Sequence, residues 1–321
     1  MKTAGIIGAA GYSGGELVRL LLNHPQVELT LAYSRSQAGQ KISDVHKDLL
    51  GDTELTFTNQ ISQSVDILFL ALPHGQSKIF LQEHPLNSDT LIIDLSNDFR
   101  LKKDAGDFVY GLPEFQRDKI KTARHIANAG CFASGIQLGL LPLAAAGLLQ
   151  SDIHISAITG STGAGVKLSE TSHFSWRNDN ISTYKMFTHQ HLGEIGETLS
   201  TLQNNFEHQV YFMPHRGDFA RGIFASIYTD FEGNTSEAQA LYRKYYQDHP
   251  FTLVTDSNPD LKQVVNTNKC ILFPSVIQKQ IVIISMVDNL LKGASGQAVQ
   301  NMNIAMGWNE TEGLKLKAVV Y

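Results

Sequence analysis

A glycine-rich turn close to the N-terminus most constrains what this chain can fold into. Lys2–Gly8 has the apolar character of a short strand, and Gly14–Asn23 has leucines at helical spacing. The turn between them reads Gly8-Ala-Ala-Gly11-Tyr-Ser-Gly14-Gly15. Glycine allows a tight turn and a close approach to a pyrophosphate, and the N–H groups that open the following helix favour an anion.

The spacing of this turn is one residue longer at its start than the usual dinucleotide fingerprint, and a plain tight turn is the alternative. Its position between a strand and an amphipathic helix favours a dinucleotide site. The residues predicted to hold the cofactor there are Gly8, Gly11, Tyr12, Ser13, Gly14 and Gly15.

The end of the second predicted strand bears on which dinucleotide binds. Val27–Tyr33 runs into Ser34, Arg35 and Ser36, with no acidic residue to bind a ribose 2′-hydroxyl. A guanidinium flanked by hydroxyls suits a 2′-phosphate. The sequence therefore favours NADP over NAD, with a solvated turn as the alternative.

The order of the predicted elements indicates two domains in the 321 residues. Strand and helix patterns alternate in the first part, where Val65–Leu70 and Leu91–Leu95 are further strands, so a parallel α/β sheet of Rossmann type is expected. The middle part has strand patterns with few helices between them, so a second α+β domain with a mixed or antiparallel sheet is expected. These strands are Ile153–Thr159, Val210–Met213, Gly222–Asp230 and Gln280–Val287.

Leu290–Met306 has a helical pattern and is expected to pack on the first domain. The predicted division is residues 1–130 with 290–321 as the NADP-binding domain, and residues 131–289 as the catalytic and oligomerisation domain.

Composition excludes several classes of function. The formal net charge is −5 and no stripe of Lys and Arg is present, which argues against a nucleic-acid partner. No apolar run reaches the roughly 18 residues of a membrane span, and the N-terminus lacks the order of a signal peptide. Two cysteines, Cys131 and Cys270, are too few for a disulfide framework. A cytoplasmic location is therefore expected, with room for a reactive thiol.

Cys131 is the candidate nucleophile. It lies in Asn128-Ala-Gly-Cys131-Phe-Ala-Ser-Gly135, directly before a strongly apolar segment. A cysteine at the start of a helix is a better thiolate because the helix dipole stabilises its charge. A thiolate attacks an acyl carbon to form a thioester. A buried structural cysteine is the alternative, and Cys270, between apolar neighbours, fits that alternative.

His189-Gln-His191-Leu-Gly-Glu194 is the candidate acid/base block. Histidine exchanges protons near neutral pH, and a carboxylate three residues along a helix could orient an imidazole. His-x-His also occurs in metal sites, but no further ligand cluster has suitable spacing, so no metal is predicted. Surface histidines are the remaining alternative.

With these residues the chain resembles the N-acetyl-γ-glutamyl-phosphate reductase family, which is related to aspartate-semialdehyde dehydrogenase. The resemblance runs along nearly the whole chain through ordered blocks. They are Gly8–Leu17, Ala71–Gly75, Ile93–Arg100, Tyr110–Glu114, Gly130–Phe132, Thr159–Gly165, His189–Glu194, Arg221–Ile223 and Asp288–Gly293.

The resemblance implies roles by position. Cys131 matches the nucleophile, and the acid/base comes from the block of His189, His191 and Glu194, with His191 preferred because Glu194 could support it. Residues expected near the cofactor are Pro73, Gly163, Gly165 and Asn289, although either glycine run could be a plain loop. Residues expected at the substrate are Arg100 (phosphate), Asn128 and Arg221 (α-carboxylate); a surface ion pair of Arg100 with Asp98 and a surface charge at Arg221 are the alternatives.

Two positions depart from the family pattern. Ala129 and Gly193 stand where the family usually has proline, so the nucleophile loop and the first turn after His191 are less constrained. Neither change removes a reactive group.

The resemblance implies NADPH-dependent reduction of N-acetyl-γ-glutamyl phosphate to the semialdehyde, with release of phosphate, in arginine biosynthesis. An aspartyl or aminoadipyl substrate stays open because one methylene is worth about 1–3 kcal/mol in a pocket, and so does a succinyl group on nitrogen. A dinucleotide-binding regulator without enzymatic activity is the alternative of another class. A homodimer or homotetramer is expected from the resemblance.

Overall fold

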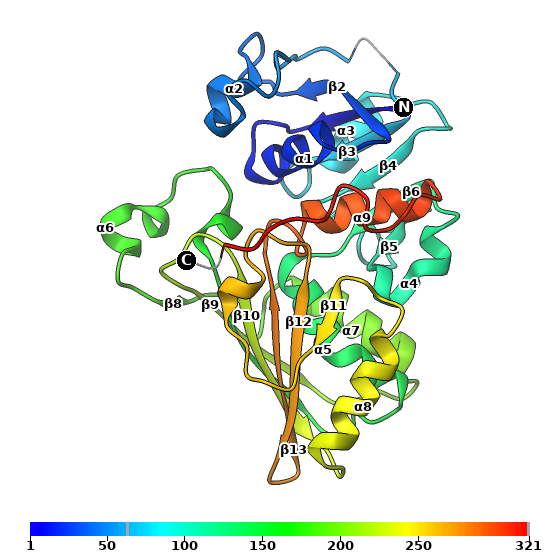
Figure 1. Cartoon of the computed structure of the whole chain (residues 1–321), viewed down its shortest axis with the longest axis vertical. Helices are drawn as coiled ribbons and strands as arrows, with labels where there is room; N and C mark the ends of the chain where they lie inside the picture. Colours follow the sequence, from blue (N-terminus) through cyan, green and yellow to red (C-terminus); the bar gives the residue numbers. More distant parts are fainter. Residues whose placement is uncertain (62–63, 320–321) are drawn as a thin grey trace. The chain divides into compact units, whose positions relative to one another are not determined.

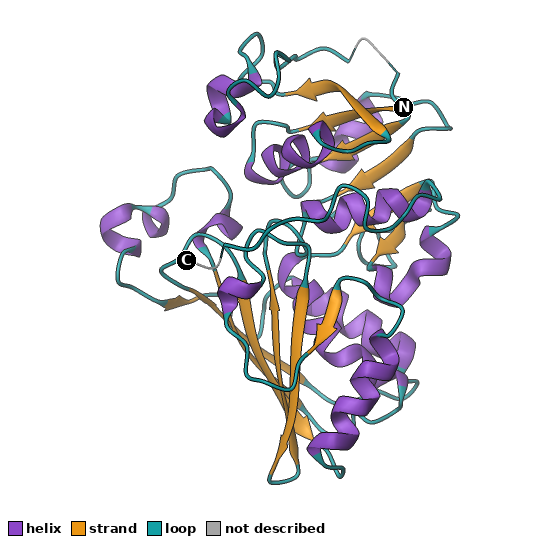
Figure 2. Cartoon of the chain, in the orientation of Figure 1, coloured by secondary structure: helices purple, strands orange, loops and turns teal. Residues whose placement is uncertain are grey.

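The computed structural model describes residues 1–61 and 64–319, and these form two compact units. The first unit comprises Met1–Gly130 and Ala294–Lys315. The second comprises Cys131–Gly293 together with the segment that begins at Leu316. Figure 1 labels the elements in chain order, and Figure 2 separates helices from strands.

The first unit is built on a six-stranded sheet in the order β2-β1-β3-β4-β6-β5, in which every pairing is parallel. Its strands are β1 (Lys2–Ile7), β2 (Val27–Tyr33), β3 (Ile67–Leu70), β4 (Leu91–Asp94), β5 (Val109–Gly111) and β6 (His125–Asn128). Its helices are α1 (Tyr12–Leu22), α2 (Ile42–Val45), η1 (Lys47–Leu49), α3 (Ser77–Glu83), α4 (Pro113–Ile120) and α9 (Ser295–Ala305).

Burial explains why these segments became strands and helices. Every residue of β3 and β4 is buried, as expected for parallel strands covered on both faces. Helix α1 buries Leu17, Leu20 and Leu21 on the face that the sequence predicted. The expected parallel α/β sheet is confirmed.

Helix α9 begins later than predicted. The sequence pattern suggested a helix from Leu290, but the helix starts at Ser295. The reason is local, because the Asp288 carboxylate accepts hydrogen bonds from the N–H groups of Leu290 and Leu291 and holds the chain in a turn. From Ser295 the helix packs against α1, α4 and the β4–β6 side of the first sheet.

The second unit is built on a seven-stranded mixed sheet in the order β11-β12-β13-β10-β7-β9-β8. This confirms the expected α+β domain with a mixed or antiparallel sheet. Its strands are β7 (Ile153–Thr159), β8 (Ser182–Thr183), β9 (Val210–Arg216), β10 (Ile223–Asp230), β11 (Thr252–Val254), β12 (Cys270–Ile277) and β13 (Gln280–Val287). Its helices are α5 (Cys131–Ala145), η2 (Ser161–Ala164), η3 (Glu170–Ser172), α6 (Phe174–Arg177), α7 (His191–Leu202), α8 (Thr235–Tyr246) and η4 (Leu261–Gln263).

Helices α5 and α8 cover one face of this sheet, and α7 packs on α5 and β9. Strand β10 alternates accordingly: Ile223, Ala225 and Ile227 are buried, whereas Ser226 and Tyr228 are partly or fully exposed on the other face. Cys270 is buried in β12, as predicted for a structural cysteine.

Helix α5 contains Pro142, which cannot donate a hydrogen bond to the carbonyl of Leu138 one turn earlier. The hydroxyl of Tyr246, from α8, donates to that carbonyl instead. The hydroxyl of Tyr242 donates to the next carbonyl, that of Gly139, at 2.5 Å. Two tyrosines of α8 thus satisfy the main chain around the proline and fix α5, which begins at Cys131.

Within the described part of the chain, no helix combines the length and apolar character needed to cross a bilayer.

Candidate active site

The glycine-rich turn follows β1 and leads into α1 in the first unit. Gly8 has φ +89°, and a Cβ there would lie 2.4 Å from the carbonyl oxygen of Ala71. A Cβ on Gly14 would lie 2.3 Å from the carbonyl oxygen of Gly8, so glycine is required at both positions. Helix α1 has no acidic residue in its first turn and no side-chain cap, which suits a phosphate at its N-terminus.

The strand order places this turn at a switch point of the sheet. From β1 the chain goes to β2 on one side, whereas β3 on the other side of β1 leads to β4. Ligands of open α/β sheets bind at the carboxyl ends of the strands at such a point. The loop after β3 carries Pro73, which is exposed, and Ala71 donates to the carbonyl of Ile7 at 2.8 Å. The structure therefore places the glycine-rich turn against Ala71, at the start of the loop that carries Pro73.

His46 supports the turn and was not predicted from the sequence. Its Nε2 lies 2.9 Å from the carbonyl oxygen of Ala9, and a Cβ on Gly15 would lie 2.5 Å from the ring. No local pattern marks His46 because its contact depends on how the segment after β2 folds back.

Ser34 and Arg35 lie at the end of β2, as predicted. Arg35 is exposed, and its Nε donates to the hydroxyl of Tyr33 at 3.1 Å. This hydrogen bond to the Tyr33 hydroxyl raises the pKa of the guanidinium, which stays charged. The carboxylate of Glu83 lies 3.8 Å from Arg35 in a solvated ion pair, which is weak enough for a phosphate to displace.

Arg100 is buried rather than paired at the surface with Asp98. Asp98 accepts hydrogen bonds from the main-chain N–H groups of Gly75, Ser77 and Lys78 and so caps α3. Arg100 donates to the carbonyls of Asn128 and Leu95 at 2.9 and 2.8 Å.

Asn128 lies three residues before Cys131, and its side chain forms hydrogen bonds with other residues of the first unit. Its amide nitrogen donates to the carbonyl of Ala294, and its amide oxygen accepts from Asn301. These contacts fix the end of β6.

Cys131 is the first residue of α5, a helix of 15 residues, and is partly exposed. Gly293 packs on it, because a Cβ on Gly293 would lie 2.9 Å from the Cys131 Cβ. The hydroxyl of Tyr184 has a raised pKa, first because it is buried and second because of the charge at Cys131. Tyr184 is therefore a neutral phenol within electrostatic reach of the sulfur, although no sequence motif identified it.

The histidines gather around Phe132, the residue after Cys131. The ring centroids of His189 and His191 lie 5.5 and 6.3 Å from that of Phe132, and both histidines are buried. The Nδ1 of His189 accepts a hydrogen bond from the main-chain N–H of His191 at 3.2 Å. Glu194, one turn into α7, lies 3.8 Å from the Nε2 of His191, which is longer than a hydrogen bond.

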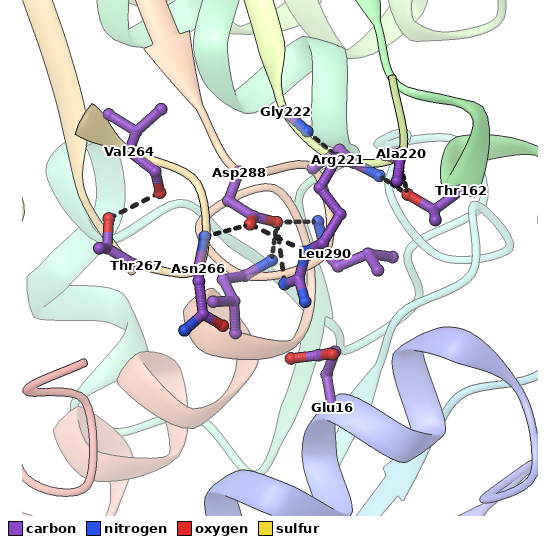
Figure 3. Close-up of polar contacts among 12 residues, drawn as sticks. Glu16, Thr162, Ala220, Arg221, Gly222, Val264, Asn266, Thr267, Asp288 and Leu290 are labelled. Carbon is purple, nitrogen blue, oxygen red and sulfur yellow. Dashed lines mark hydrogen bonds and ion pairs between the residues drawn. The ribbon is translucent and has the colours of Figure 1, made fainter. Parts of the chain in front are cut away.

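A polar network joins the turn of Gly163 and Gly165 to the end of β13. The side chain of Asn289 accepts from the main-chain N–H of Gly222 at 2.7 Å and donates to Thr162 at 3.0 Å. Thr162 in turn donates to the carbonyl of Ala220 (Figure 3). Asn289 thus positions the loop that the sequence associated with the cofactor.

Asp288 is the centre of the cluster drawn in Figure 3 and is fully buried. Its carboxylate accepts from Nε and Nη2 of Arg221 at 3.0 and 3.2 Å, and from the main-chain N–H of Asn266 at 2.7 Å. Arg221, expected to bind a substrate carboxylate, is therefore engaged by a carboxylate of its own unit. The sequence did not reveal this pair, whose members lie 67 residues apart.

Within residues 1–61 and 64–319 no group of three or more His, Cys, Asp or Glu side chains could hold a metal ion.

Comparison with known proteins matches both units to one family. Residues 3–123 match the semialdehyde dehydrogenase NAD binding domain. Residues 131–289 match the semialdehyde dehydrogenase dimerisation domain.

Solved structures show the same fold at low sequence identity. Aspartate semialdehyde dehydrogenase II of Vibrio cholerae, complexed with ASA, has a TM-score of 0.76 and 14% identity over 96% of this chain and 98% of its own. The Candida albicans aspartate semialdehyde dehydrogenase with NADP has a TM-score of 0.72 and 15% identity over 95% and 98%.

Full-length relatives are much more similar. The N-acetyl-gamma-glutamyl-phosphate reductase of Parabacteroides distasonis is 58% identical over 318 residues, which cover 99% of each chain. The enzyme of the same name from Flavobacterium johnsoniae is 54% identical over 323 residues, again 99% of each. The chain therefore belongs to the semialdehyde dehydrogenase family of oxidoreductases, within its group of N-acetyl-gamma-glutamyl-phosphate reductases.

Proposed function

We propose that this protein reduces N-acetyl-γ-glutamyl phosphate to N-acetyl-glutamate 5-semialdehyde with release of phosphate, using NADPH, as a step of arginine biosynthesis. The observation that carries the proposal is the position of Cys131 as the first residue of α5, with two buried histidines against the neighbouring Phe132. The names of the relatives supply the substrate.

The sulfur begins the reaction as a thiolate, because the N-terminus of α5 stabilises a negative charge there. It attacks the γ-acyl carbon, the carbon–oxygen bond to phosphate breaks, and a thioester forms. The N–H groups that open α5 are suited to stabilise the tetrahedral oxyanion. Arg100, which is buried and permanently charged, is the proposed partner of the phosphate.

NADPH, when bound, supplies the hydride that reduces the thioester carbonyl. One of the two histidines gives a proton to the oxyanion that remains on the thiohemiacetal, and it takes this proton back as the carbon–sulfur bond breaks, which returns the thiolate and releases the aldehyde. His191 is the preferred acid/base because Glu194 lies near its Nε2. His189, which contacts Tyr184 ring to ring at 5.7 Å, is the alternative.

NADP rather than NAD is proposed as the cofactor, on the guanidinium of Arg35 and the hydroxyls of Ser34 and Ser36. The residues of the turn fit a dinucleotide, because Cβ atoms on Gly8 and Gly14 would fill the space between main chains. Asn289 and the turn of Gly163 and Gly165 are proposed to lie at the nicotinamide end.

A homodimer is proposed through the face of the second sheet that lies opposite α5. On that face Tyr228 and Met213 are 40% and 36% exposed. The match of this unit to a dimerisation domain supports the proposal.

The test is the reverse reaction, NADP reduction with phosphate and N-acetyl-glutamate semialdehyde. We expect kcat of the Cys131→Ala variant to fall at least about a thousandfold, because alanine cannot form the covalent intermediate. Cys270→Ala, at the buried cysteine of β12, is the matched control and should retain activity. Comparable activity in the Cys131 variant would rule out the thioester route.

A further inference from the structure

A pair of adjacent arginines in the second unit is not used by the proposed reaction. Arg177 ends α6 and Arg216 ends β9. Nη1 of Arg177 donates to the main-chain carbonyl of Arg216 at 2.8 Å. Both side chains also contact Thr171: Arg177 donates to its carbonyl at 3.3 and 3.2 Å, and Arg216 donates to its hydroxyl at 3.2 Å.

Within the described part of the chain, the hydrogen-bond and ring partners of both guanidiniums are neutral groups. Besides Thr171, Arg177 contacts the hydroxyl of Ser182 at 3.4 Å, and its guanidinium lies over the ring of Trp176. The guanidinium of Arg216 lies 5.1 Å from the ring centroid of Tyr184. Among the described residues neither arginine forms an ion pair.

Such an arrangement is costly without an anion. Arg177 is 7% exposed, and buried arginines normally have a charged partner. The Nε of Arg216 is buried and has no hydrogen-bond partner in the described part of the chain. Burial, followed by the like charge of Arg216, lowers the pKa of Arg177, and the exposed Asp218 opposes this only from a distance. Two guanidiniums that lack a counter-ion suit a carboxylate, because its two oxygens can accept hydrogen bonds from them.

The pair also lies near the nucleophile. Tyr184, on which Arg216 packs, contacts His189 and responds to the charge at Cys131. One aromatic residue, Tyr184, therefore links the arginine pair to the proposed catalytic histidines of the same unit. Arg221, the other candidate for a carboxylate partner, is already engaged by Asp288.

We propose that Arg177 and Arg216 bind a carboxylate of the substrate and so determine which N-acyl glutamyl compounds the enzyme accepts. This inference rests on the proposed function. Two carboxylates fit the chemistry: the α-carboxylate, which every such substrate carries, and a second carboxylate at the end of a dicarboxylic N-acyl group such as succinyl.

The experiment compares N-acetyl- and N-succinyl-glutamate semialdehyde in the reverse reaction, with wild type, Arg216→Gln and Arg177→Gln. Loss of a charged hydrogen-bond partner should lower kcat/KM about ten- to a hundredfold, mainly through KM, while KM for NADP stays within about twofold. Arg216→Lys, which keeps the charge, should recover part of the loss. Arg243→Gln, on the outer part of α8, is the matched control and should behave as wild type.

The two substrates distinguish the two carboxylates. An equal loss with both assigns the pair to the α-carboxylate, whereas a loss confined to the succinyl compound assigns it to the terminal carboxylate. Unchanged kinetics with both compounds, in a variant that melts at the wild-type temperature, would overturn the proposal.

A binding assay decides the matter if a variant folds poorly or if the wild type is inactive. N-acetyl-glutamate and N-succinyl-glutamate should raise the melting temperature of the wild type, and at least one of these shifts should shrink in Arg216→Gln and Arg216→Lys. If the wild type shows these shifts but has no activity, the proposed function is refuted and the carboxylate site is not. Equal shifts in all proteins, or no shift in any, would refute the carboxylate site.

Discussion

At the scale of single residues, the chemistry of the site depends on groups whose charge is fixed by their surroundings. Asp288 illustrates this, since its fully buried carboxylate accepts hydrogen bonds from Arg221 and from three main-chain N–H groups. Tyr184 illustrates the opposite case, because burial and the nearby Cys131 keep its hydroxyl protonated.

Arg35 gives a prediction at this scale. Arg35→Ser removes the exposed guanidinium at the end of β2, so the KM for NADPH should rise about tenfold or more while the KM for NADH changes little. Steady-state kinetics with both cofactors measure this. Arg124→Ser, another exposed arginine of the first unit, is the control. Equal effects on both cofactors would show that Arg35 does not contact a 2′-phosphate.

Residue-level prediction from sequence succeeded where a few neighbouring residues determine the outcome. The turn of Gly8 and Gly14 and the helix start at Cys131 are local features, and their spacing is visible in the sequence. Arg177 and Arg216 lie 39 residues apart, and only the folded sheet brings them together. The sequence could not show that pair, nor that Arg221 is engaged by Asp288.

At the scale of elements, helix α5 determines the position of Cys131, the proposed nucleophile, which is its first residue. Its proline leaves the carbonyl of Leu138 without a helical donor, and Tyr246 of α8 supplies one. The sequence predicted a helix that begins at Cys131 and an apolar segment after it, and the structure has α5 there with Phe132–Ala144 buried. The compensation by α8 could not be predicted, because a tyrosine hydroxyl has many accessible partners before tertiary packing selects one.

Tyr246→Phe should therefore destabilise the protein by about 1–3 kcal/mol, the cost of leaving a buried carbonyl unsatisfied. Chemical denaturation followed by circular dichroism measures it. Tyr228→Phe, which removes a hydroxyl from a 40% exposed side chain, should change stability by less than about 0.5 kcal/mol. Equal stability of the two variants would mean that the Tyr246 hydroxyl does not compensate for the proline.

At the scale of the whole molecule, the chain passes from the first unit to the second between Gly130 and Cys131 and returns between Gly293 and Ala294. Cys131, the proposed nucleophile, is thus the first residue of its unit, and Gly293, the last residue before the return, packs against it. Alternation of strand and helix patterns predicted the first, parallel sheet, and strand patterns with few helices between them predicted the second, mixed sheet.

Assembly is the prediction at this scale. Ser226 lies on the partly exposed face of β10, opposite Ile284 of β13. Ser226→Arg should convert the proposed dimer to monomers, because a charge buried in the interface would lack a partner. Light scattering coupled to size exclusion measures the mass. Gln247→Arg, an exposed position after α8, should leave the dimer intact; a Ser226 variant of unchanged mass would place the interface elsewhere.

The central claim is that a thioester forms on Cys131, and mass spectrometry of the acylated enzyme tests it most directly. The protein is mixed with freshly prepared N-acetyl-γ-glutamyl phosphate without NADPH, quenched in acid and digested. We expect a mass increase of one acyl group on the peptide that contains Cys131, removed by hydroxylamine and absent from Cys131→Ala. An unmodified Cys131 peptide from enzyme that is active with NADPH, or an acyl group on another residue, would contradict it.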